Sequence, residues 1–548
     1  MVCAVASSTF GRKEPAVKLT KGKVLRIRHG LAGKFVVAVL LIALLSCSGK
    51  DAQPPPPPTT LAPQVTTNKP TVTSTIEPPA PTASATAVAT EIPRFEPGEC
   101  TAPVTLGLQH HCGWLVVLED RTKPDGRLLR LPVVVFEART SNPRPDPVIY
   151  LAGGGGVNQM AMMSLYSDFV SAVVAERDFI MYNQRGAPLT DPELDCAGLE
   201  EVLWELAERH PSLEERNQRL VEFWSECRSD LAARGIDLNM YSTSANAADA
   251  DDLRIALGYD RANYYGTSYG TRIGLVLLRD RSDGVRSIIL DSVYPPEAGY
   301  YTTYASHVAR ALTTLFDECS SDPACVEQYG DLERVFTETV DQLDAESQII
   351  VYANGRVVID GMMFIDVLYA LLQSTPGRQE ALSFIEAASK GDLLRFRHVF
   401  PMLFEYPGNI AVYYSFQCRE EVPKHAFDDV VAGAAGVPAK VSDYAVQYFA
   451  ALDYAVCELW DVQPSGSGES APVESDVPAL VLAGAVDAIT PPEWGRTAAG
   501  HLSNGWFYEI PGQAHGTMRT SACAREIALT FLEDPRAKPD AACIQNTN

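Results

Sequence analysis

A Gly-x-Ser-x-Gly pentapeptide, Gly266 to Gly270, lies between a short aromatic run and an amphipathic stretch. This pattern is typical of a sharp strand-to-helix turn that exposes its serine at the edge of a sheet. The flanking glycines are needed because a side chain there would collide with the neighbouring backbone. The bare pattern arises by chance about 0.15 times in a chain of this size, so the surrounding sequence must decide. If the turn forms, Ser268 is the candidate nucleophile.

The chain around this pentapeptide alternates strand-like and helix-like runs. Such alternation favours an α/β fold with a doubly wound, mostly parallel sheet and helices on both faces. The predicted strands are residues 131–136, 147–151, 178–182, 263–265, 287–290, 479–483 and 506–510.

A long stretch of a different kind separates the fifth predicted strand from the sixth. Its apolar residues recur with helical spacing at 308–316, 332–343 and 364–372, and Asn354-Gly355 predicts a hairpin within 349–359. We therefore expect a mainly helical cap at 300–475, inserted between a first core segment at 99–299 and a C-terminal core segment at 476–548. A lid of this kind would exclude water and set substrate size.

The N-terminal region resembles an export signal. Eight Lys and Arg residues precede the apolar run 35–45, which ends at Leu45-Ser46-Cys47. We expect residues 1–47 to be a signal peptide with a lipoprotein-type cleavage site, which would make Cys47 a lipidated N-terminus that anchors the protein to the membrane. Plain secretion and an uncleaved anchor are the alternatives. A start at Val24 would give a more ordinary signal.

Residues 48–98 are rich in Pro, Thr and Ala and include the run Pro54 to Pro58. Such a segment cannot bury enough apolar surface to fold. We expect a disordered stalk between the membrane and the catalytic body.

Composition limits the partners and the cofactors. The chain has 548 residues, is 46% hydrophobic, and carries a formal net charge of -24. It can bury a large core, but it lacks the basic surface that would neutralise nucleic-acid phosphates. We expect a peptide substrate, no nucleic acid, and no metal or organic cofactor; the oligomeric state is left open.

Ten cysteines remain when Cys3 and Cys47 are set aside, an even number in an oxidising compartment. They are expected to form disulfides, although sequence does not determine the connectivity. Metal binding is a weak rival, because the chain has no Cys-x-x-Cys motif and no histidine cluster. Nearest-neighbour pairing would join Cys100 with Cys112, Cys196 with Cys227, Cys319 with Cys325, Cys418 with Cys457, and Cys523 with Cys543.

A serine nucleophile needs an imidazole base held by a carboxylate. Asp487 follows one late predicted strand and His515 follows the next. The chain order Ser268, Asp487, His515 is the order of α/β-hydrolase triads. All three residues fall after strands, where parallel sheets place their ligands.

Other residues compete for these roles. Asp291 also follows a predicted strand and is the alternative acid. His501 lies at an expected helix end and is more plausible as a surface residue. His110 and His111 precede the strand expected to start the sheet, so a catalytic role for them would break the chain order.

The reaction also needs two backbone N–H groups for the oxyanion. Gly153 to Gly156 follow a predicted strand at the position of an oxyanion loop. The expected donors are the amides of Gly154 and Tyr269. A merely flexible loop is one alternative, and a phosphate loop is another, but no Gly-Lys-Ser/Thr follows the glycines.

Together these segments resemble the exported tripeptidyl aminopeptidases and proline iminopeptidase-like peptidases of the α/β-hydrolase superfamily, over most of residues 100–543. The resemblance implies cleavage of short peptides from a free N-terminus, with the cap closing the far end of the site. The segments that carry it are Tyr150 to Gly156, Asn183 to Gly186, Asn246 to Arg254, Leu257 to Tyr259, the Ser268 turn, Gly484 to Pro492, and the Gly-x-x-His-Gly around His515.

Two positions depart from the family pattern. Gly155 stands where the family loop usually has proline, and Asn183 stands where it usually has aspartate, which would remove a carboxylate near Arg185. These departures put loop stiffness and substrate range in question. They leave the triad unchanged.

An exopeptidase needs carboxylates for the substrate ammonium, because a buried cation requires a paired anion. Glu420 and Glu421 in the cap are the candidates, although they are equally explained as solvated surface residues. We expect an extracytoplasmic serine aminopeptidase that is lipid-anchored or secreted. The alternatives are a hydrolase of small esters or amides and a non-catalytic surface binding protein on the same fold.

Overall fold

The computed structural model of the chain describes residues 92–353, 355–404 and 406–546. The predicted signal peptide, Cys47 and most of the predicted stalk lie outside the described residues. Among the helices within these ranges, none is both long and apolar enough to cross a membrane.

A nine-stranded sheet forms the core, with strand order β1-β2-β3-β5-β4-β6-β7-β10-β11. The six strands from β5 to β11 in this order are parallel, which confirms the predicted mostly parallel α/β sheet. They are β4 (Val148–Leu151), β5 (Phe179–Tyr182), β6 (Ala262–Thr267), β7 (Val285–Asp291), β10 (Ala479–Gly484) and β11 (Gly505–Ile510). The antiparallel strands are β1 (Arg94–Gly98), β2 (His110–Leu118) and β3 (Leu128–Phe136).

Helices cover both faces of the sheet, so its central strands are buried on both sides. In β4, Ile149 and Leu151 pack into one hydrophobic cluster while Val148 and Tyr150 pack into another. The first cluster includes residues of α5 (Thr243–Ala256), α6 (Tyr269–Arg281) and α16 (Pro492–Gly500). The second includes residues of α1 (Gln159–Met162), α2 (Ser167–Val173), α17 (Thr517–Thr520) and α18 (Ala522–Glu533).

The sheet begins earlier in the chain than the sequence predicted. The stalk was predicted to reach residue 98, but Arg94–Gly98 form β1 and pair antiparallel with β2. Neither strand was predicted. Pro97 made β1 look like stalk, but proline is tolerated in a strand at the edge of a sheet.

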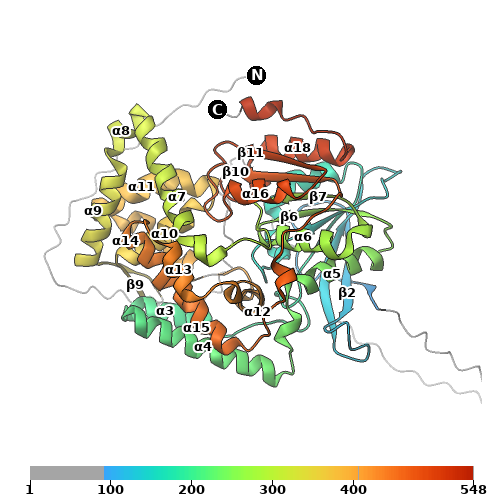
Figure 1. Ribbon diagram of the computed structural model, residues 1–548, viewed down its shortest axis with the longest axis horizontal. Helices are drawn as coiled ribbons and strands as arrows, with labels where there is room; N and C mark the ends of the chain where they lie inside the picture. Colours follow the sequence, from blue (N-terminus) through green and yellow to red (C-terminus); the bar gives the residue numbers. More distant parts are fainter. Residues whose placement is uncertain (1–91, 354, 405, 547–548) are drawn as a thin grey trace, which may run out of the picture. The chain divides into compact units, whose positions relative to one another are not determined.

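The cap contains the helices predicted for 300–475 and also two helices from the first core segment. Figure 1 shows α3 (Leu199–Arg209) and α4 (Leu213–Ala233) on the cap side of the molecule, and α4 packs against α15. The segment of α3 and α4, which the sequence analysis included in the first core segment, therefore packs with the cap, whereas α7 begins at the expected boundary. The other cap helices are α7 (Tyr300–Ser321), α8 (Pro323–Tyr329), α9 (Leu332–Ala345), α10 (Gly361–Leu372), α11 (Thr375–Ser389), α12 (Ile410–Glu420), α13 (Phe427–Gly433), α14 (Ala439–Asp443) and α15 (Ala451–Trp460).

Apolar packing explains why α3 and α4 belong with the cap. Phe223 and Trp224 of α4 share a buried cluster with Tyr414 of α12 and Trp460 of α15. Without this contact, the apolar stripe of α4 would face water. The cap also holds the predicted hairpin, formed by β8 (Gln348–Val351) and β9 (Arg356–Ile359).

Five disulfides join the cysteines, and all five are the nearest-neighbour pairs. The pair Cys418–Cys457 links α12 to α15 inside the cap, and Cys196–Cys227 ties α4 to the segment before α3. The cap is therefore crosslinked independently of the sheet.

Candidate active site

Ser268 occupies a strained turn between β6 and α6. Its backbone has φ 56 and ψ -126, a conformation that few non-glycine residues adopt. A Cβ at Gly266 would lie 2.5 Å from the carbonyl oxygen of Gly270, and one at Gly270 would lie 2.0 Å from that of Leu151. Both glycines are thus required for the turn to approach β4, as the pentapeptide predicted.

Asp487 and His515 form a hydrogen-bonded pair in the loops after β10 and β11. Nδ1 of His515 lies 2.9 Å from Oδ2 and 3.1 Å from Oδ1 of the carboxylate, which is fully buried. The backbone amides of Ile489 and Thr490 donate to Oδ1, and the Thr490 hydroxyl donates to Oδ2 at 2.9 Å. These bonds fix the carboxylate in the orientation that the imidazole needs.

The same contacts set the charge of Asp487. Burial by itself raises the pKa of a carboxyl group, but here the charge and the hydrogen bond of His515 and the two backbone amides outweigh burial. The pKa of Asp487 therefore lies below its ordinary value. The group is ionised at neutral pH and can hold one imidazole tautomer and stabilise an imidazolium.

Asp291, the alternative acid, lies at the end of β7 and contacts the backbone beyond His515. Its carboxylate accepts the amide and hydroxyl of Thr517 at 2.9 and 2.8 Å and the amide of Met518 at 3.1 Å. Burial raises the pKa of Asp291 despite these bonds. In this structure Asp291 anchors the His515 loop, whereas Asp487 contacts the ring itself.

Ser268, Asp487 and His515 follow the strands β6, β10 and β11 at the same edge of the sheet. None of the hydrogen bonds among the described residues joins Ser268 Oγ to the imidazole. In unliganded enzymes this contact is often long and tightens only with substrate.

The other three histidines considered as candidates lie elsewhere. His501 caps the C-terminus of α16. His110 and His111 begin β2, and His111 forms an ion pair with Glu137 at 2.9 Å. The structure brings none of them into the Asp487 pair.

The glycine loop lies directly beside the nucleophile turn. A Cβ at Gly153 would lie 3.0 Å from Cβ of Ser268, and Gly154 has φ +60. Across the described residues, the backbone amides of Gly154 and Tyr269 donate to no other group, so both predicted oxyanion donors are available. The hydroxyl of Tyr406 donates to the carbonyl oxygen of Gly154 at 2.9 Å and holds the loop from the cap side.

The two departures from the family pattern have local causes. A Cβ at Gly155 would lie 2.3 Å from the ring of Phe416 in α12, so proline does not fit there. Asn183 is fully buried, and its Nδ2 donates to the carbonyl oxygen of Pro188 at 2.6 Å and to Oδ1 of Asn158 at 3.2 Å. An aspartate could not donate these bonds.

Arg185 does not lack a carboxylate. It forms a bidentate ion pair with Asp249, with both contacts at 2.7 Å and both side chains fully buried. This pair joins two segments that carried the family resemblance, the Asn183 turn and α5. The geometry explains why both motifs occur in one sequence.

Glu420 and Glu421 are buried rather than solvated. Arg272 of α6 contacts Glu420 at 3.2 Å and Glu421 at 2.5 Å, and Lys424 contacts Glu421 at 2.6 Å. Thr243 donates two further bonds to Glu420, at 2.7 and 2.6 Å. Two carboxylates thus meet two cations, which leaves no net negative charge for a substrate ammonium. The predicted ammonium role stays a prediction, and it would require a cation to give way.

Two family models match the chain: the alpha/beta hydrolase fold over residues 146–310 and TAP-like protein over residues 443–543. The first match contains Ser268, and the second contains Asp487 and His515. The chain therefore has the α/β-hydrolase fold.

Curated relatives of the chain are peptidases by name. A tripeptidyl aminopeptidase of Streptomyces lividans is 30% identical over 205 residues, which is 36% of this chain and 38% of that protein. The serine protease Hip1 of Mycobacterium bovis is 26% identical over 239 residues, 40% of this chain and 45% of that protein. The chain thus matches less than half the length of these relatives. Among solved structures, the α/β hydrolase MGS-M2 from a deep-sea metagenome library is 11% identical, with 75% of this chain and 96% of that chain covered and a TM-score of 0.36.

Sequence reasoning missed three residues at the site. Thr490 contacts both Asp487 and His515: its hydroxyl donates to Oδ2 of Asp487 at 2.9 Å and lies 3.2 Å from Nδ1 of His515. From the cap, Tyr369 donates to the carbonyl oxygen of Ala488 at 2.9 Å, and Arg310 donates to that of Asp487. The position of Thr490, three residues after the acid, was a usable signal. The cap residues had none, because their contacts depend on how α7 and α10 dock.

Proposed function

We propose that this hydrolase is a serine aminopeptidase that releases short peptides or single residues from the free N-terminus of peptides. Ser268 attacks the scissile carbonyl and forms an acyl-enzyme, and His515 removes the serine proton and later returns it to the leaving amine. Asp487 orients the imidazole, and the amides of Gly154 and Tyr269 stabilise the oxyanion. Water then attacks the ester and releases the N-terminal product.

The observation that carries the proposal is the His515–Asp487 pair beside a serine with φ 56. Strained backbone at a strand end is typical of a reactive serine, and the paired acid and base supply its activation. The peptidase half of the proposal draws on the relatives, which are named for peptide substrates. A cap over the site suits substrates of limited length.

Substitution of Ser268 by Ala tests the mechanism. We expect the Ser268→Ala protein to fold, to lose turnover, and to lose labelling by a fluorophosphonate probe. Ser292 gives a matched control, because it also follows a strand with φ 62, yet it is fully buried and its Oγ accepts the amide of Gly516. Ser292→Ala should keep the label. Labelling that survives in Ser268→Ala would refute the mechanism, and an unlabelled wild-type protein would favour a binding protein on this fold.

The substrate class is tested with chromogenic anilides of one, two and three residues, with free and acetylated N-termini, beside p-nitrophenyl esters. An aminopeptidase cleaves the free-amine anilides and spares the acetylated ones. Preference for the esters would instead make the protein an esterase.

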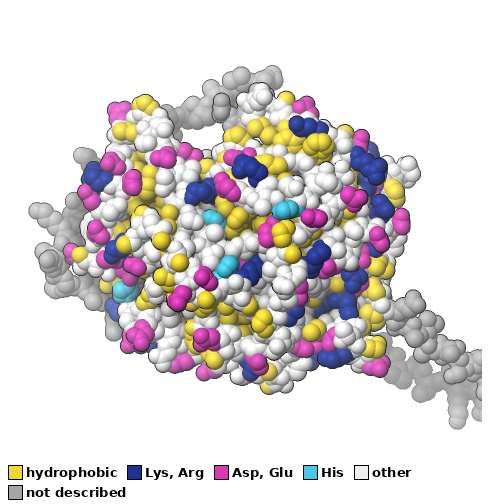
Figure 2. Space-filling view, in the orientation of Figure 1, with side chains coloured by type: hydrophobic (Ala, Val, Ile, Leu, Met, Phe, Trp, Pro, Cys, Tyr) yellow, Lys and Arg dark blue, Asp and Glu magenta, His cyan; other side chains and the backbone are white. Residues whose placement is uncertain are grey.

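We also propose that the enzyme is exported and tethered through Cys47, with the Pro/Thr-rich segment as its stalk. The acidic chain supports a partner other than nucleic acid, and acidic and basic side chains are interspersed on the face shown in Figure 2. Mass spectrometry of the mature N-terminus tests the anchor. A diacylglyceryl-modified Cys47 is expected, and an unmodified N-terminus in the culture medium would show plain secretion.

A further inference from the structure

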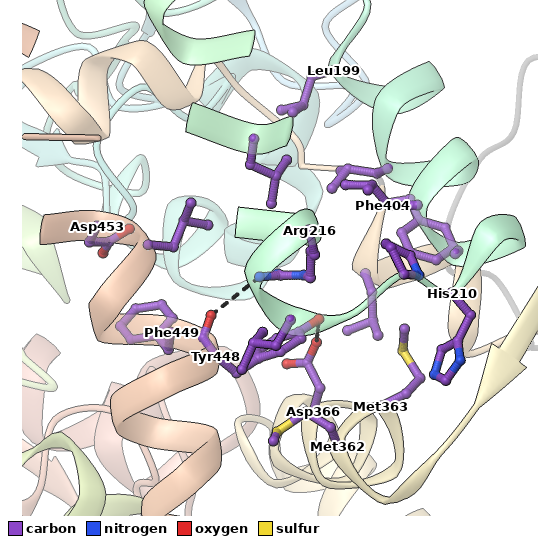
Figure 3. Close-up of a pocket in the computed structure, with 18 of the residues that line it drawn as sticks. Leu199, His210, Arg216, Met362, Met363, Asp366, Phe404, Tyr448, Phe449 and Asp453 are labelled. Atoms are coloured by element: carbon purple, nitrogen blue, oxygen red, sulfur yellow. Dashed lines mark hydrogen bonds between the residues drawn. The ribbon is translucent and has the colours of Figure 1, made fainter. Parts of the chain in front are cut away.

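The cap encloses a cavity of about 550 Å³ between α3 and α4 on one side and α10, α12 and α15 on the other. Figure 3 shows Leu199, Phe404, Met362 and Met363 around this space. Most of the wall is apolar, with a few charged groups among the aromatic side chains. Cavities of this size and lining are typical of small-molecule or peptide sites, in which a few polar groups fix the orientation.

Asp453 is the most unusual group in this wall. It is 3% exposed, and its Oδ2 accepts hydrogen bonds from Tyr301 at 2.8 Å and Tyr413 at 2.7 Å. Across residues 92–546, apart from 354 and 405, no Lys, Arg or His forms an ion pair with it. The buried Asp249 and Glu421, by contrast, each contact a cation. A buried carboxylate without a cation is costly, so an external cation is a natural partner.

The charges in the cavity do not balance. Asp366 accepts bonds from Tyr444 at 2.8 Å and Tyr448 at 3.3 Å, and it too lacks an ion pair within the described ranges. The one guanidinium nearby, that of Arg216, stacks 3.8 Å from the Tyr448 ring and donates to the carbonyl oxygen of Tyr448 (Figure 3). Burial raises the pKa of both Asp453 and Asp366, and when both are ionised they carry one more negative charge than Arg216 compensates. Of the other carboxylates of the wall, Asp344 forms an ion pair with Lys440, and Asp360 lies 2.9 Å from Nε2 of His210, which compensates its charge only when the imidazole is protonated.

The cavity is one side-chain layer from the reaction centre. Tyr406 lines it and, through its hydroxyl, contacts the carbonyl oxygen of Gly154. Tyr413 also lines it and packs against Phe416, whose ring stacks on Tyr269 with centroids 4.1 Å apart. The cavity and the oxyanion donors thus lie on either side of one layer of aromatic side chains.

We propose that this cavity holds the N-terminal end of the peptide substrate, with the ammonium bound by Asp453 and apolar side chains packed on the surrounding wall. The inference rests on the proposed aminopeptidase function and names its substrate class: short peptides with a free amine and apolar N-terminal residues. Asp366 supplies the second negative charge that offsets Arg216. In this arrangement Asp453 determines specificity and takes no part in bond cleavage.

The titration of Asp453 provides an independent readout. The groups that face it are Tyr301 from α7, Tyr413 and Tyr414 from α12, and Arg216 from α4. Burial raises the pKa of Asp453 to about 6, although the three tyrosines and Arg216 oppose the shift. The ammonium of a peptide remains protonated there, since its pKa is near 8. Affinity for free-amine peptides should therefore fall as the pH drops through about 6, as the carboxylate takes up a proton.

The binding test uses Ser268→Ala protein, which cannot turn substrate over, titrated calorimetrically with Leu-Leu amide and with acetyl-Leu-Leu amide. We expect binding of the free amine only, and a loss of affinity of roughly 10- to 100-fold when Asp453→Asn is added. Asp360→Asn is the matched control, because Asp360 lines the same cavity but caps α10 and has His210 as partner, and asparagine keeps the cap. Equal affinity for the two amides, or equal effects of the two substitutions, would overturn the proposal.

Kinetics complete the test in the active protein. Asp453→Asn should raise KM for free-amine anilides by the same factor by which it lowers affinity in the binding test, with kcat nearly unchanged. The wild-type KM should rise as the pH drops through about 6, and the KM of Asp453→Asn should not. Fluorophosphonate labelling of Ser268 should proceed at the wild-type rate in the variant. A wild-type protein that the fluorophosphonate does not label would refute the proposed function. The calorimetric experiment tests the ammonium site independently of that outcome, because it uses protein that cannot turn substrate over. A KM that does not respond to Asp453→Asn would refute the ammonium site alone.

Discussion

Two buried carboxylates lie at the edge of the sheet beside His515, and exchanging each for asparagine separates their roles. Asp487 contacts the imidazole at 2.9 Å, whereas Asp291 contacts the amide and hydroxyl of Thr517 beyond it and, at 3.4 Å, the hydroxyl of Tyr265. Both substitutions keep the size of the side chain and remove its charge. Their effects on turnover should therefore differ, although both residues follow strands of the same sheet.

The expected magnitudes follow from these contacts. The amide that replaces the carboxylate in Asp487→Asn stabilises neither the correct tautomer of His515 nor its imidazolium. Such a change lowers kcat about 10⁴-fold, which corresponds to about 5.5 kcal/mol in activation free energy. Asp291→Asn keeps one oxygen for Thr517 and loses the bond from the Met518 amide at 3.1 Å. Loss of one charge-assisted bond costs about 1.5–3 kcal/mol of stability. Because burial raises the pKa of Asp291, removing its charge offsets part of that loss.

The assay is kcat on a free-amine chromogenic peptide, together with the free energy of unfolding of each variant. We expect Asp487→Asn to fold normally and to lose activity about 10⁴-fold, and Asp291→Asn to be less stable with kcat within about 10-fold of wild type. The reasoning is refuted if folded Asp291→Asn loses as much activity as Asp487→Asn, or if Asp487→Asn keeps most of its turnover.

Three further predictions concern packing and charge. Gly155→Ala places a methyl group 2.3 Å from the Phe416 ring, so the free energy of unfolding should fall by about 1–3 kcal/mol. Adding Phe416→Leu should restore part of that free energy. Equal stability of the wild type and Gly155→Ala would contradict the contact. Asn183→Asp removes the donor that binds the Pro188 carbonyl at 2.6 Å and buries a charge. A thermal melt at neutral pH should therefore show that the free energy of unfolding falls by at least ~1–3 kcal/mol. An unchanged melting temperature would contradict this role of the Asn183 side chain. Burial raises the pKa of Asp453 from 3.8 to about 6, so the wild type should lose about 3 kcal/mol of stability as pH rises from about 4 to above 6. Denaturant titrations at both ends of this range should show that Asp453→Asn lacks this loss, and parallel pH profiles of the two proteins would contradict it.

Part of the fold could be predicted from the sequence because its signals are local. Runs such as 147–151 are largely apolar, which is typical of a strand buried on both faces, and each predicted run overlaps a strand of the sheet, although β4 begins at Val148 and β5 at Phe179. The edge strand β1 could not be predicted, since Pro97 and its neighbours share the composition of the preceding segment. Helices α3 and α4 were predicted as part of the core because sequence position does not reveal which surface an amphipathic helix covers.

The candidate site divides in the same way. Ser268, Asp487 and His515 could be named because each follows a strand and the turn chemistry around Ser268 is specific. Asp291 met the same criterion and could not be separated from Asp487 by sequence. The hydrogen bonds to the imidazole and to Thr517 distinguish them, and these depend on loop conformation.

The sequence by itself determined the parallel strands of the sheet, the strained serine turn and the order of the candidate triad, since each depends on residues adjacent in the chain. Only the tertiary structure decided which carboxylates carry compensated charge. Glu420 and Glu421 meet Arg272 and Lys424, whereas Asp453 meets tyrosines and a cavity. That difference arises because the free energy of a buried charge depends on groups that folding brings together from distant parts of the chain.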